Sequence, residues 1–90
     1  MKLEIEFTTQ FKKDYKKVKR QNKDISKLYS VINLLSSGKK LNQSLKDHPL
    51  TGELKGMRDC HIEPDWVLIY KLTPGLLSLQ RTGSHSDLFK

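Results

Sequence analysis

Cysteine is nearly absent from this sequence, since Cys60 is the single example among 90 residues. An internal disulfide and the paired-cysteine motifs of zinc and redox sites are therefore excluded, and one free thiol is typical of a protein of the reducing cytoplasm. Long apolar runs are also lacking, because the run from Val67 to Tyr70 is far shorter than the roughly 18 residues of a transmembrane helix. Glu4 and Glu6 stand where a signal peptide would have its apolar stretch, so we expect neither a signal peptide nor a membrane partner.

Charge, by contrast, is abundant and unevenly distributed. Lysine and arginine number 17 against 10 aspartates and glutamates, which gives a net charge of +7. Residues 1–46 carry a net charge of +8 and residues 47–90 a net charge of −1, while all three histidines and Trp66 lie in the second half. We therefore expect the first half to dock on a polyanionic or acidic partner and the second half to hold the groups that titrate near neutral pH. A solvated, lysine-rich helix is the alternative explanation of the charge.

Two apolar periodicities organise the first half of the chain. Residues 2–7 alternate charged and apolar side chains, which predicts a half-buried strand. Apolar residues then recur at helical spacing, which predicts one helix after a cap at Thr8 or Thr9 and a second helix over residues 24–37, capped by Asp24. We expect these two amphipathic helices to form a hairpin.

The second half has the composition of strands. Residues 38–53 are polar and irregular, and three strand candidates follow at residues 54–62, 66–72 and 76–82. The short links between them imply an antiparallel arrangement. The sequence therefore predicts a single α+β domain over residues 1–90, in the order β-α-α-β-β-β, with two N-terminal helices packed on one face of a small, mainly antiparallel sheet.

Polar side chains that could take part in chemistry gather near the strand ends and in the loops. They are Asp47, His48, Lys55, Arg58, Asp59, His61, Asp65, Trp66, Arg81 and His85. A chain reversal at residues 63–65 would bring His61 and Trp66 nearly opposite each other, with Asp65 at the turn. Imidazoles beside a carboxylate can supply a base and an acid near neutral pH, and an arginine can hold an anion. Because no cysteine or serine nucleophile accompanies them, the set favours cleavage of RNA, whose own 2′-hydroxyl is the nucleophile.

For several of these residues a simpler role is also open. The three histidines and Asp65 are acceptable zinc ligands, yet no HxH or HExxH spacing occurs, so we expect no metal and no other cofactor. Trp66 either packs in the interior or stacks on a base. Arg81 continues the apolar row of Leu77 and Leu79 with a charge, so it either pairs with a carboxylate or faces a ligand.

Three segments carry a resemblance to a known family. They are KDHPL at residues 46–50, KGMRDCHIEPDWVLIY at residues 55–70 and RTGSHSDLF at residues 81–89. Together with the order of elements they resemble the YafQ branch of the RelE-like bacterial toxins, whereas the helix pair is similar only in type and basic character. The resemblance implies a toxin of a type II toxin–antitoxin system. Such a toxin enters the ribosome and cuts messenger RNA there without a metal, and a cognate antitoxin neutralises it by wrapping around it.

The resemblance also implies roles for individual residues. The acid/base set would be His48, His61, Asp65 and His85, and the substrate-binding set would be Trp66, Phe89 and the phosphate clamp Arg81. We expect His85 to be the general acid that protonates the leaving 5′-oxygen. Either Asp65 or His48 would accept the 2′-hydroxyl proton, with His61 orienting or sharing that role. From its charge, independently of the resemblance, we expect the first helix to dock on ribosomal RNA through Lys12, Lys13, Lys16, Lys17, Lys19 and Arg20.

Two other functions stay open from the residues alone. The chain could be a non-catalytic RNA-binding module that uses the basic helices and aromatic stacking, or a protein-binding module that accepts an acidic peptide. Loss of the histidines would abolish activity in an endoribonuclease, whereas an RNA-binding module would depend on the lysines instead.

Overall fold

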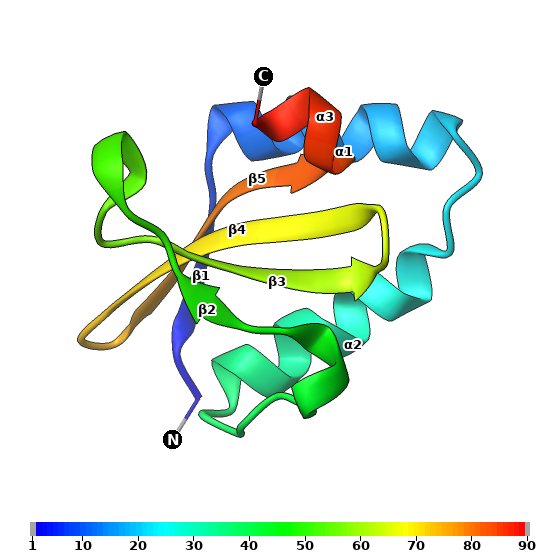
Figure 1. The fold of residues 1–90 in the computed structure, drawn as a ribbon. Coiled ribbons are helices and arrows are strands. Elements are labelled where there is room, and N and C mark those ends of the chain that lie inside the picture. The colour runs from blue at the N-terminus through cyan, green and yellow to red at the C-terminus, as the bar shows by residue number, and fades with distance from the viewer. Residues whose placement is uncertain (1, 90) are drawn as a thin grey trace.

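The sheet joins the first strand of the chain to the last. The computed structural model describes residues 2–89 and contains one five-stranded sheet in the order β1-β5-β4-β3-β2 (Figure 1). Its strands are β1 (Glu4–Phe7), β2 (His48–Pro49), β3 (Arg58–Glu63), β4 (Trp66–Thr73) and β5 (Leu76–Gly83). β1 runs parallel to β5, and the three other neighbouring pairs that the structure describes are antiparallel. The expected mainly antiparallel sheet is therefore confirmed.

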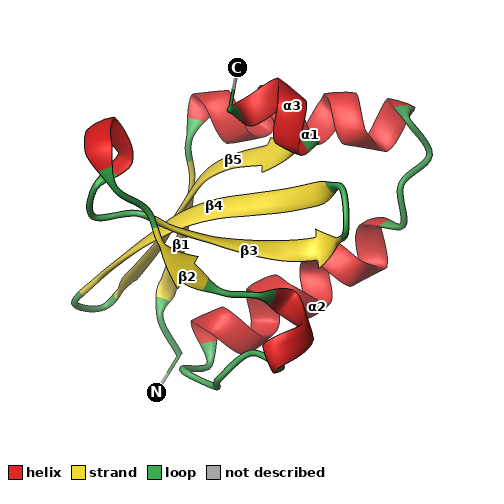
Figure 2. Ribbon diagram, viewed as in Figure 1, coloured by secondary structure: helices red, strands yellow, loops and turns green. Residues whose placement is uncertain are grey.

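Local capping determines where the long helices begin. The helices are α1 (Thr9–Arg20), α2 (Ile25–Ser36) and the short α3 (His85–Leu88) (Figure 2). The Thr8 hydroxyl accepts a hydrogen bond from the backbone nitrogen of Phe11 at 3.2 Å, and the Asp24 carboxylate accepts one from the backbone nitrogen of Ser26 at 3.0 Å. Both caps were expected from the sequence, because a side-chain oxygen there satisfies an otherwise unpaired amide of the first turn. Of the helices within residues 2–89, none is long and apolar enough to cross a membrane.

The core lies between the sheet and the two long helices. Apolar side chains from α1, α2 and strands β3 to β5 form one buried cluster, consisting of Phe11, Val18, Leu28, Val31, Ile32, Leu35, Cys60, Ile62, Trp66, Leu68, Tyr70, Leu77 and Leu79. The other face of β4 is buried as well, since Val67 and Ile69 are at most 1% exposed. Cys60 packs in this cluster, and its burial raises the pKa of its thiol to about 12.

The strands differ from the prediction at three points. The strand expected from Leu54 begins at Arg58, because Gly52–Leu54 form a 3-10 turn and Gly56 has a φ of +94°, a left-handed conformation that strands do not adopt. Phe7 is 43% exposed although its alternation predicted a buried face. The two-residue strand β2, inside the segment expected to be irregular, pairs with β3.

A β-bulge interrupts the pairing between β4 and β5. Ile69 pairs with Arg81, but the next residue of β4, Tyr70, pairs with Leu79. Gln80 is therefore the extra residue on β5, and it has no partner across the ladder. Because side chains alternate along a strand, one extra residue exchanges the two faces of β5 beyond this point.

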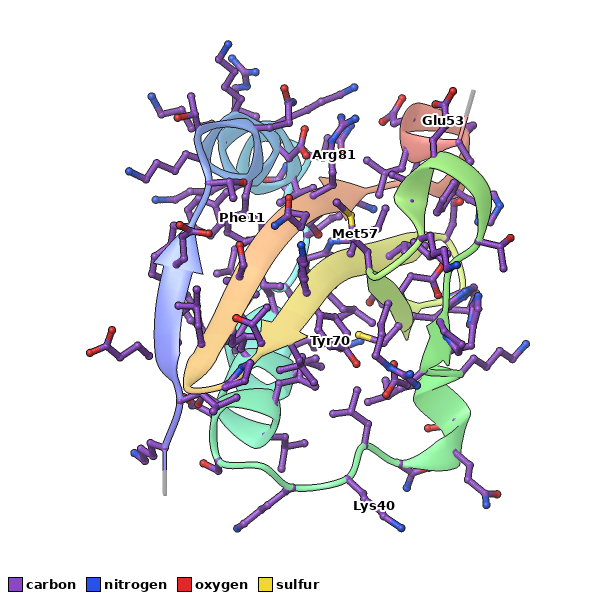
Figure 3. The ribbon with its side chains drawn as sticks, turned by 90° about the vertical axis from the view of Figure 1, so that its left-hand side faces the viewer. Phe11, Lys40, Glu53, Met57, Tyr70 and Arg81 are labelled. Atoms are coloured by element: carbon purple, nitrogen blue, oxygen red, sulfur yellow. The ribbon has the colours of Figure 1, made fainter. Side chains whose placement is uncertain are left out.

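The bulge changes which side chain of β5 faces the helices. Leu77 and Leu79 lie in the helix-side core, and beyond the bulge it is Thr82, paired with Leu68, that continues this face. Arg81 lies on the opposite face, close to Met57 (Figure 3). The expectation that Arg81 continues the row of Leu77 and Leu79 is therefore wrong, and the charge stays out of the core.

Thr82 completes the hydrogen bonding of the buried indole. Trp66 Nε1 donates to Thr82 Oγ1 at 2.9 Å, and Thr82 Oγ1 donates to the carbonyl oxygen of Val67 at 3.0 Å. Trp66 has no exposed surface, so its N–H has no access to water. We expect Thr82→Val to lower the free energy of unfolding by about 1–3 kcal/mol, because a buried donor loses its acceptor.

Urea denaturation of Thr82→Val and of Thr73→Val measures this effect. Thr73 lies on β4 and is exposed, so the same substitution there should change the free energy of unfolding by less than about 0.5 kcal/mol. Equal losses at the two positions would contradict the role of the buried hydroxyl.

Candidate active site

The three histidines form a row on one side of the molecule. His48 comes from β2, His61 from β3 and His85 from the start of α3. The ring centroids of His48 and His61 are 6.4 Å apart, as are those of His61 and His85. Phe89 extends the row, with its ring centroid 4.7 Å from that of His85. The structure thus brings together four of the predicted site residues, which we call the histidine row: His48, His61, His85 and Phe89.

A buried carboxylate lies beneath the row. Asp59 is directly opposite His48 in the β2–β3 pair, and it is 2% exposed. Its Oδ1 atom is 3.1 Å from His48 Nδ1 and 4.0 Å from His61 Nε2. The sequence marked Asp59 only as one polar residue among ten. The signal that could have singled it out is its spacing, because Asp59 and His61 are two apart on a strand and therefore share a face.

Burial governs the electrostatics of Asp59. Removal from water raises the pKa of this carboxyl, and the nearby imidazoles of His48, His61 and His85 act in the opposite direction. Oδ1 is fully buried and makes no hydrogen bond within the described part of the chain. Its charge is therefore compensated by ion pairing with the histidines rather than by donors, and the compensation is complete only when an imidazole carries a proton.

The position of His48 identifies which of its nitrogens can act as a base. Its Nδ1 is 2.7 Å from the carbonyl oxygen of Lys46, in addition to the contact with Asp59. Both neighbours are acceptors, so Nδ1 carries a proton and donates it to the carbonyl oxygen of Lys46. The lone pair of a neutral His48 is therefore on Nε2.

Asp47 anchors the loop that precedes His48. Its Oδ1 accepts hydrogen bonds from the Tyr70 hydroxyl at 2.6 Å and from Arg58 Nε at 3.2 Å. Burial, followed by the hydrogen bond to Asp47, raises the pKa of Tyr70, so its hydroxyl stays protonated and donates. Tyr70 was not among the residues singled out from the sequence, since its aromatic ring in an apolar strand predicts packing alone.

Asp65 contacts the row through a backbone atom. It is exposed in the turn between β3 and β4, and its Oδ1 accepts a hydrogen bond from the backbone nitrogen of His85 at 3.3 Å. This contact ties the turn to the start of α3 and helps to orient His85. The hairpin register differs from the expected one by one residue, because His61 pairs with Val67 rather than with Trp66.

Trp66 does not belong to the exposed site. Its side chain has no exposed surface, lies in the core and donates to Thr82, while Lys23 Nζ lies 5.7 Å from the ring centroid. A base needs an accessible ring face on which to stack. The prediction that Trp66 stacks on the substrate is therefore wrong, and the packing alternative holds.

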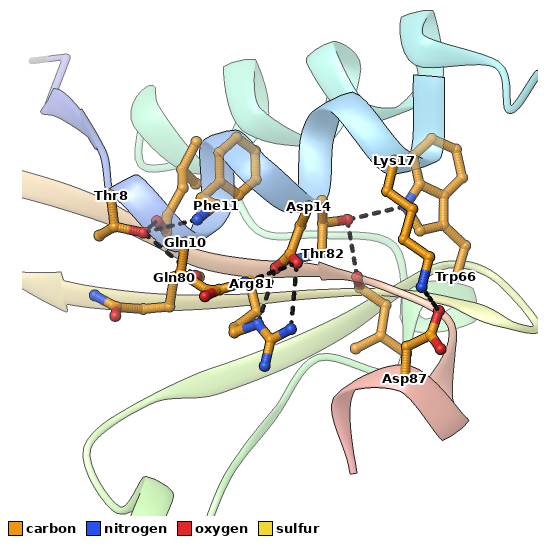
Figure 4. A network of polar contacts seen from close by, with 12 residues as sticks. Thr8, Gln10, Phe11, Asp14, Lys17, Trp66, Gln80, Arg81, Thr82 and Asp87 are labelled. Atoms are coloured by element: carbon orange, nitrogen blue, oxygen red, sulfur yellow. Dashed lines mark hydrogen bonds and ion pairs between the residues drawn. The ribbon is translucent and has the colours of Figure 1, made fainter. Parts of the chain in front are cut away.

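Arg81 is paired with a carboxylate of α1. Its Nε and Nη2 donate to the two oxygens of Asp14 at 2.8 and 3.2 Å, and Asp14 Oδ2 also accepts from the backbone nitrogen of Thr82 at 3.2 Å (Figure 4). The hydrogen bond to Asp14 is the main cause that raises the pKa of the Arg81 guanidinium. Of the two alternatives left open by the sequence, the carboxylate pair is present. A phosphate clamp at Arg81 would therefore use its remaining terminal nitrogen, Nη1.

The basic residues expected to dock on RNA lie in two rows along α1. Lys13, Lys17 and Arg20 share one side of the helix, and Lys17 Nζ reaches Asp87 of α3 at 3.1 Å (Figure 4). We call these three residues the site-side row, because α3 also carries His85. The other row, Lys12, Lys16 and Lys19, lines a separate groove between α1 and α2. No group of three or more histidine, cysteine or acidic side chains within residues 2–89 is placed to hold a metal ion.

The fold and the histidine row define a small α+β toxin domain. Residues 3–90 match the family described as "Bacterial toxin of type II toxin-antitoxin system, YafQ". The mRNA interferase toxin YafQ of Escherichia coli K12 is 48% identical over 87 residues, which cover 96% of this chain and 95% of that protein. The chain therefore belongs to the YafQ family of toxins of type II toxin–antitoxin systems, and the predicted endoribonuclease agrees with the name of this relative.

Solved structures of relatives have the same fold. The crystal structure of YafQ from E. coli BL21(DE3) superposes with a TM-score of 0.94 at 46% identity and covers 98% of this chain and 99% of that chain. The E. coli DinJ-YafQ toxin-antitoxin complex gives a TM-score of 0.92 at 46% identity, with both chains covered completely. The RelE-like α+β fold expected from the sequence is confirmed.

The raised pKa of Asp59 predicts how stability depends on pH. A carboxyl with a raised folded-state pKa binds its proton more tightly in the folded chain, so its contribution to stability falls as the pH rises from the unfolded value of about 4 through the folded value. We expect Asp59→Asn to have a melting temperature, relative to the wild type, that is higher at pH 7 than at pH 4.

Thermal denaturation at the two pH values measures this difference. Glu53→Gln removes an exposed carboxylate from the loop before β3, and its difference from the wild type should be about the same at both pH values. A larger gain for Asp59→Asn at pH 4 than at pH 7 would contradict the assignment.

Proposed function

We propose that this toxin is an mRNA interferase, which cuts messenger RNA in the ribosome by metal-independent acid–base catalysis. The observation that carries the proposal is the histidine row, with its 6.4 Å spacings above the buried Asp59. The name of the E. coli relative supports the same activity. Two imidazoles on either side of a third can serve the two ends of one phosphodiester, which neither a simple RNA-binding module nor a peptide-binding module requires.

The proposed reaction moves two protons. His48 Nε2 accepts the proton of the 2′-hydroxyl, the 2′-oxygen forms a bond to phosphorus, and the bond between phosphorus and the 5′-oxygen breaks. His85, protonated, gives its proton to the departing 5′-oxygen, and His61 lies between them to orient the phosphate or share the base role. The products are a 2′,3′-cyclic phosphate and a 5′-hydroxyl. Asp59 stabilises the imidazolium that forms on His48.

The geometry favours His48 over Asp65 as the base. Nδ1 of His48 is held by Lys46 and Asp59, which directs Nε2 away from them. Asp65 already accepts a hydrogen bond from the backbone of His85, so it serves better as a positioning residue. The opposite requirements of a neutral His48 and a protonated His85 predict a bell-shaped dependence of rate on pH.

Substrate placement is proposed to use Phe89, which follows α3, and Arg81 of β5. Phe89 contacts the His85 ring and offers an aromatic surface to a base. Arg81 borders a hollow of about 220 Å³ lined in part by Leu54, Met57 and Leu88, so its free nitrogen and this apolar surface would lie next to the same nucleotide. The basic side chains of α1, in the site-side row and in the row of Lys12, Lys16 and Lys19, then provide the charge that docks on ribosomal RNA.

We also propose that the chain pairs with a cognate antitoxin. Type II membership implies such a partner, and the E. coli relative has been crystallised in complex with DinJ. The reading frame next to that of this toxin is the first place to look for it. An antitoxin bound to the toxin should stop cleavage of messenger RNA.

His85→Ala tests the proposed chemistry. We expect the rate of messenger RNA cleavage on purified ribosomes to fall by about 10²–10⁴-fold, because general acid catalysis is worth that much. His85 lies at the exposed start of a short helix, so the melting temperature should change little. Mass spectrometry of the products should find 2′,3′-cyclic or 3′-phosphate ends and 5′-hydroxyl ends. EDTA should leave the rate of cleavage of a ribosome-free oligonucleotide unchanged.

Ser86→Ala, at the next position of α3, is the matched control and should cut at about the wild-type rate. The mechanism is overturned if His85→Ala cuts as fast as the wild type, if the products carry 5′-phosphates, or if chelation abolishes cleavage of the oligonucleotide.

A further inference from the structure

Lys46 has a backbone conformation that its residue type disfavours. It follows the 3-10 turn Gln43–Leu45 with a φ of +50° and a ψ of +42°, in the left-handed region. The other non-glycine residue with a positive φ within residues 2–89 is Asn22. Asparagine visits the left-handed region readily, whereas lysine does so rarely and stays there only where its surroundings hold it. The turn at Lys46 therefore needs an anchor, and it lies two residues before His48.

This turn brings a backbone acceptor to the proposed base. The carbonyl oxygen of Lys46 is 2.7 Å from His48 Nδ1. Asp59 Oδ1 lies 3.1 Å from the same nitrogen, but it makes no hydrogen bond within the described part of the chain. The hydrogen bond made by one ring nitrogen decides which nitrogen of a neutral imidazole carries the proton. The Lys46 carbonyl therefore selects the tautomer of His48 that has its lone pair on Nε2.

Asp47, the residue between Lys46 and His48, is bonded to the sheet. Its Oδ1 accepts hydrogen bonds from the Tyr70 hydroxyl at 2.6 Å and from Arg58 Nε at 3.2 Å, and these two donors are partners across β3 and β4. The Arg58 side chain is 37% exposed, whereas Tyr70 has no exposed surface and lies in the core. A buried side chain has lost its rotamer freedom, so the Tyr70 hydroxyl is the fixed point of this group.

We propose that Tyr70 is a positioning residue for the general base. Its hydroxyl holds Asp47, and Asp47 keeps Lys46 in the left-handed turn. The Lys46 carbonyl then keeps the proton of His48 on Nδ1, which leaves Nε2 to accept the 2′-hydroxyl proton. Tyr70 is fully buried, so it acts without contact to RNA. The base role of His48 rests on the proposed function, whereas the control of its tautomer does not.

Tyr70→Phe tests the proposal, because it removes the hydroxyl and keeps the ring in the core. The readout is the tautomer of His48, measured in the free protein by long-range ¹H–¹⁵N correlation NMR at about pH 8, above the ordinary pKa of histidine. Loss of the corresponding signals in His48→Gln assigns them. We expect the wild type to carry the proton on Nδ1 and Tyr70→Phe to be a mixture of the two tautomers.

Tyr29→Phe is the matched control. It removes the same hydroxyl from a tyrosine of α2 that is 48% exposed and whose hydroxyl lies 3.2 Å from that of Tyr15. We expect the His48 tautomer and the rate of messenger RNA cleavage to remain those of the wild type. Circular dichroism confirms that each variant is folded before it is compared.

Kinetics on purified ribosomes separate positioning from docking. We expect kcat of Tyr70→Phe to fall by about 10–100-fold, because a displaced or wrongly protonated base loses its geometry for the reaction. KM should stay near that of the wild type, since Tyr70 does not reach the surface. Adding Lys46→Asn to Tyr70→Phe should recover most of the loss, because asparagine adopts the left-handed conformation with less need of an anchor.

The outcomes distinguish this inference from the proposed function. A wild-type tautomer in Tyr70→Phe, or an equal change in Tyr29→Phe, would overturn the inference. An effect of Tyr70→Phe that Lys46→Asn does not relieve would overturn the turn at Lys46 as its route. A changed tautomer with wild-type cleavage would refute His48 as the base in the proposed function and leave the control of its tautomer by Tyr70 in place.

Discussion

At Gln80, β5 carries one residue more than its partner strand β4. This bulge determines which side chains of β5 enter the core and where Arg81 lies relative to the candidate active site. Without it, the alternation would direct Arg81 into the helix-side core, where an unpaired guanidinium costs several kcal/mol. With it, Thr82 faces inward to accept from Trp66, and Arg81 reaches Asp14 on α1. Asp14 also receives the Thr82 backbone amide, so one carboxylate joins α1 to the edge of β5 that β1 does not cover.

The features predicted from the sequence are those that local chemistry determines. Thr8 and Asp24 cap their helices through amides two or three residues away, so the residue type alone specifies the contact. The bulge at Gln80 depends on the register of two strands, and no residue type at that point indicates it. The prediction assumed an unbroken alternation of side chains along this strand, and it therefore placed Arg81 on the wrong face. Glycines at positive φ delay the start of the strand predicted over residues 54–62 for a similar reason, since their conformation depends on how the loop packs.

Only part of the candidate site could be predicted from the sequence, because residue type is visible there whereas burial and strand pairing depend on the complete fold. The three histidines are recognisable by residue type, and the antiparallel pairing of β2 with β3 and the position of α3 bring them into a row. Asp59 was not singled out, because its importance comes from burial, which depends on the complete fold. Trp66 shows the converse case: a resemblance between sequences marks a position but does not tell whether its side chain acts through packing or through contact with a ligand. Here the indole packs in the core and stabilises β4, the strand that follows the turn containing Asp65.

The parallel pairing of β1 with β5 has a consequence for how the protein is made. Glu4 pairs with Leu76, so the edge of the sheet closes only after nearly the whole chain has been synthesised. Domains fold as units during synthesis, and contacts between distant segments form late. His85 follows β5, so the histidine row is incomplete for as long as the end of the chain remains inside the ribosome. The site that we propose for cleavage is therefore among the last parts of the molecule to assemble.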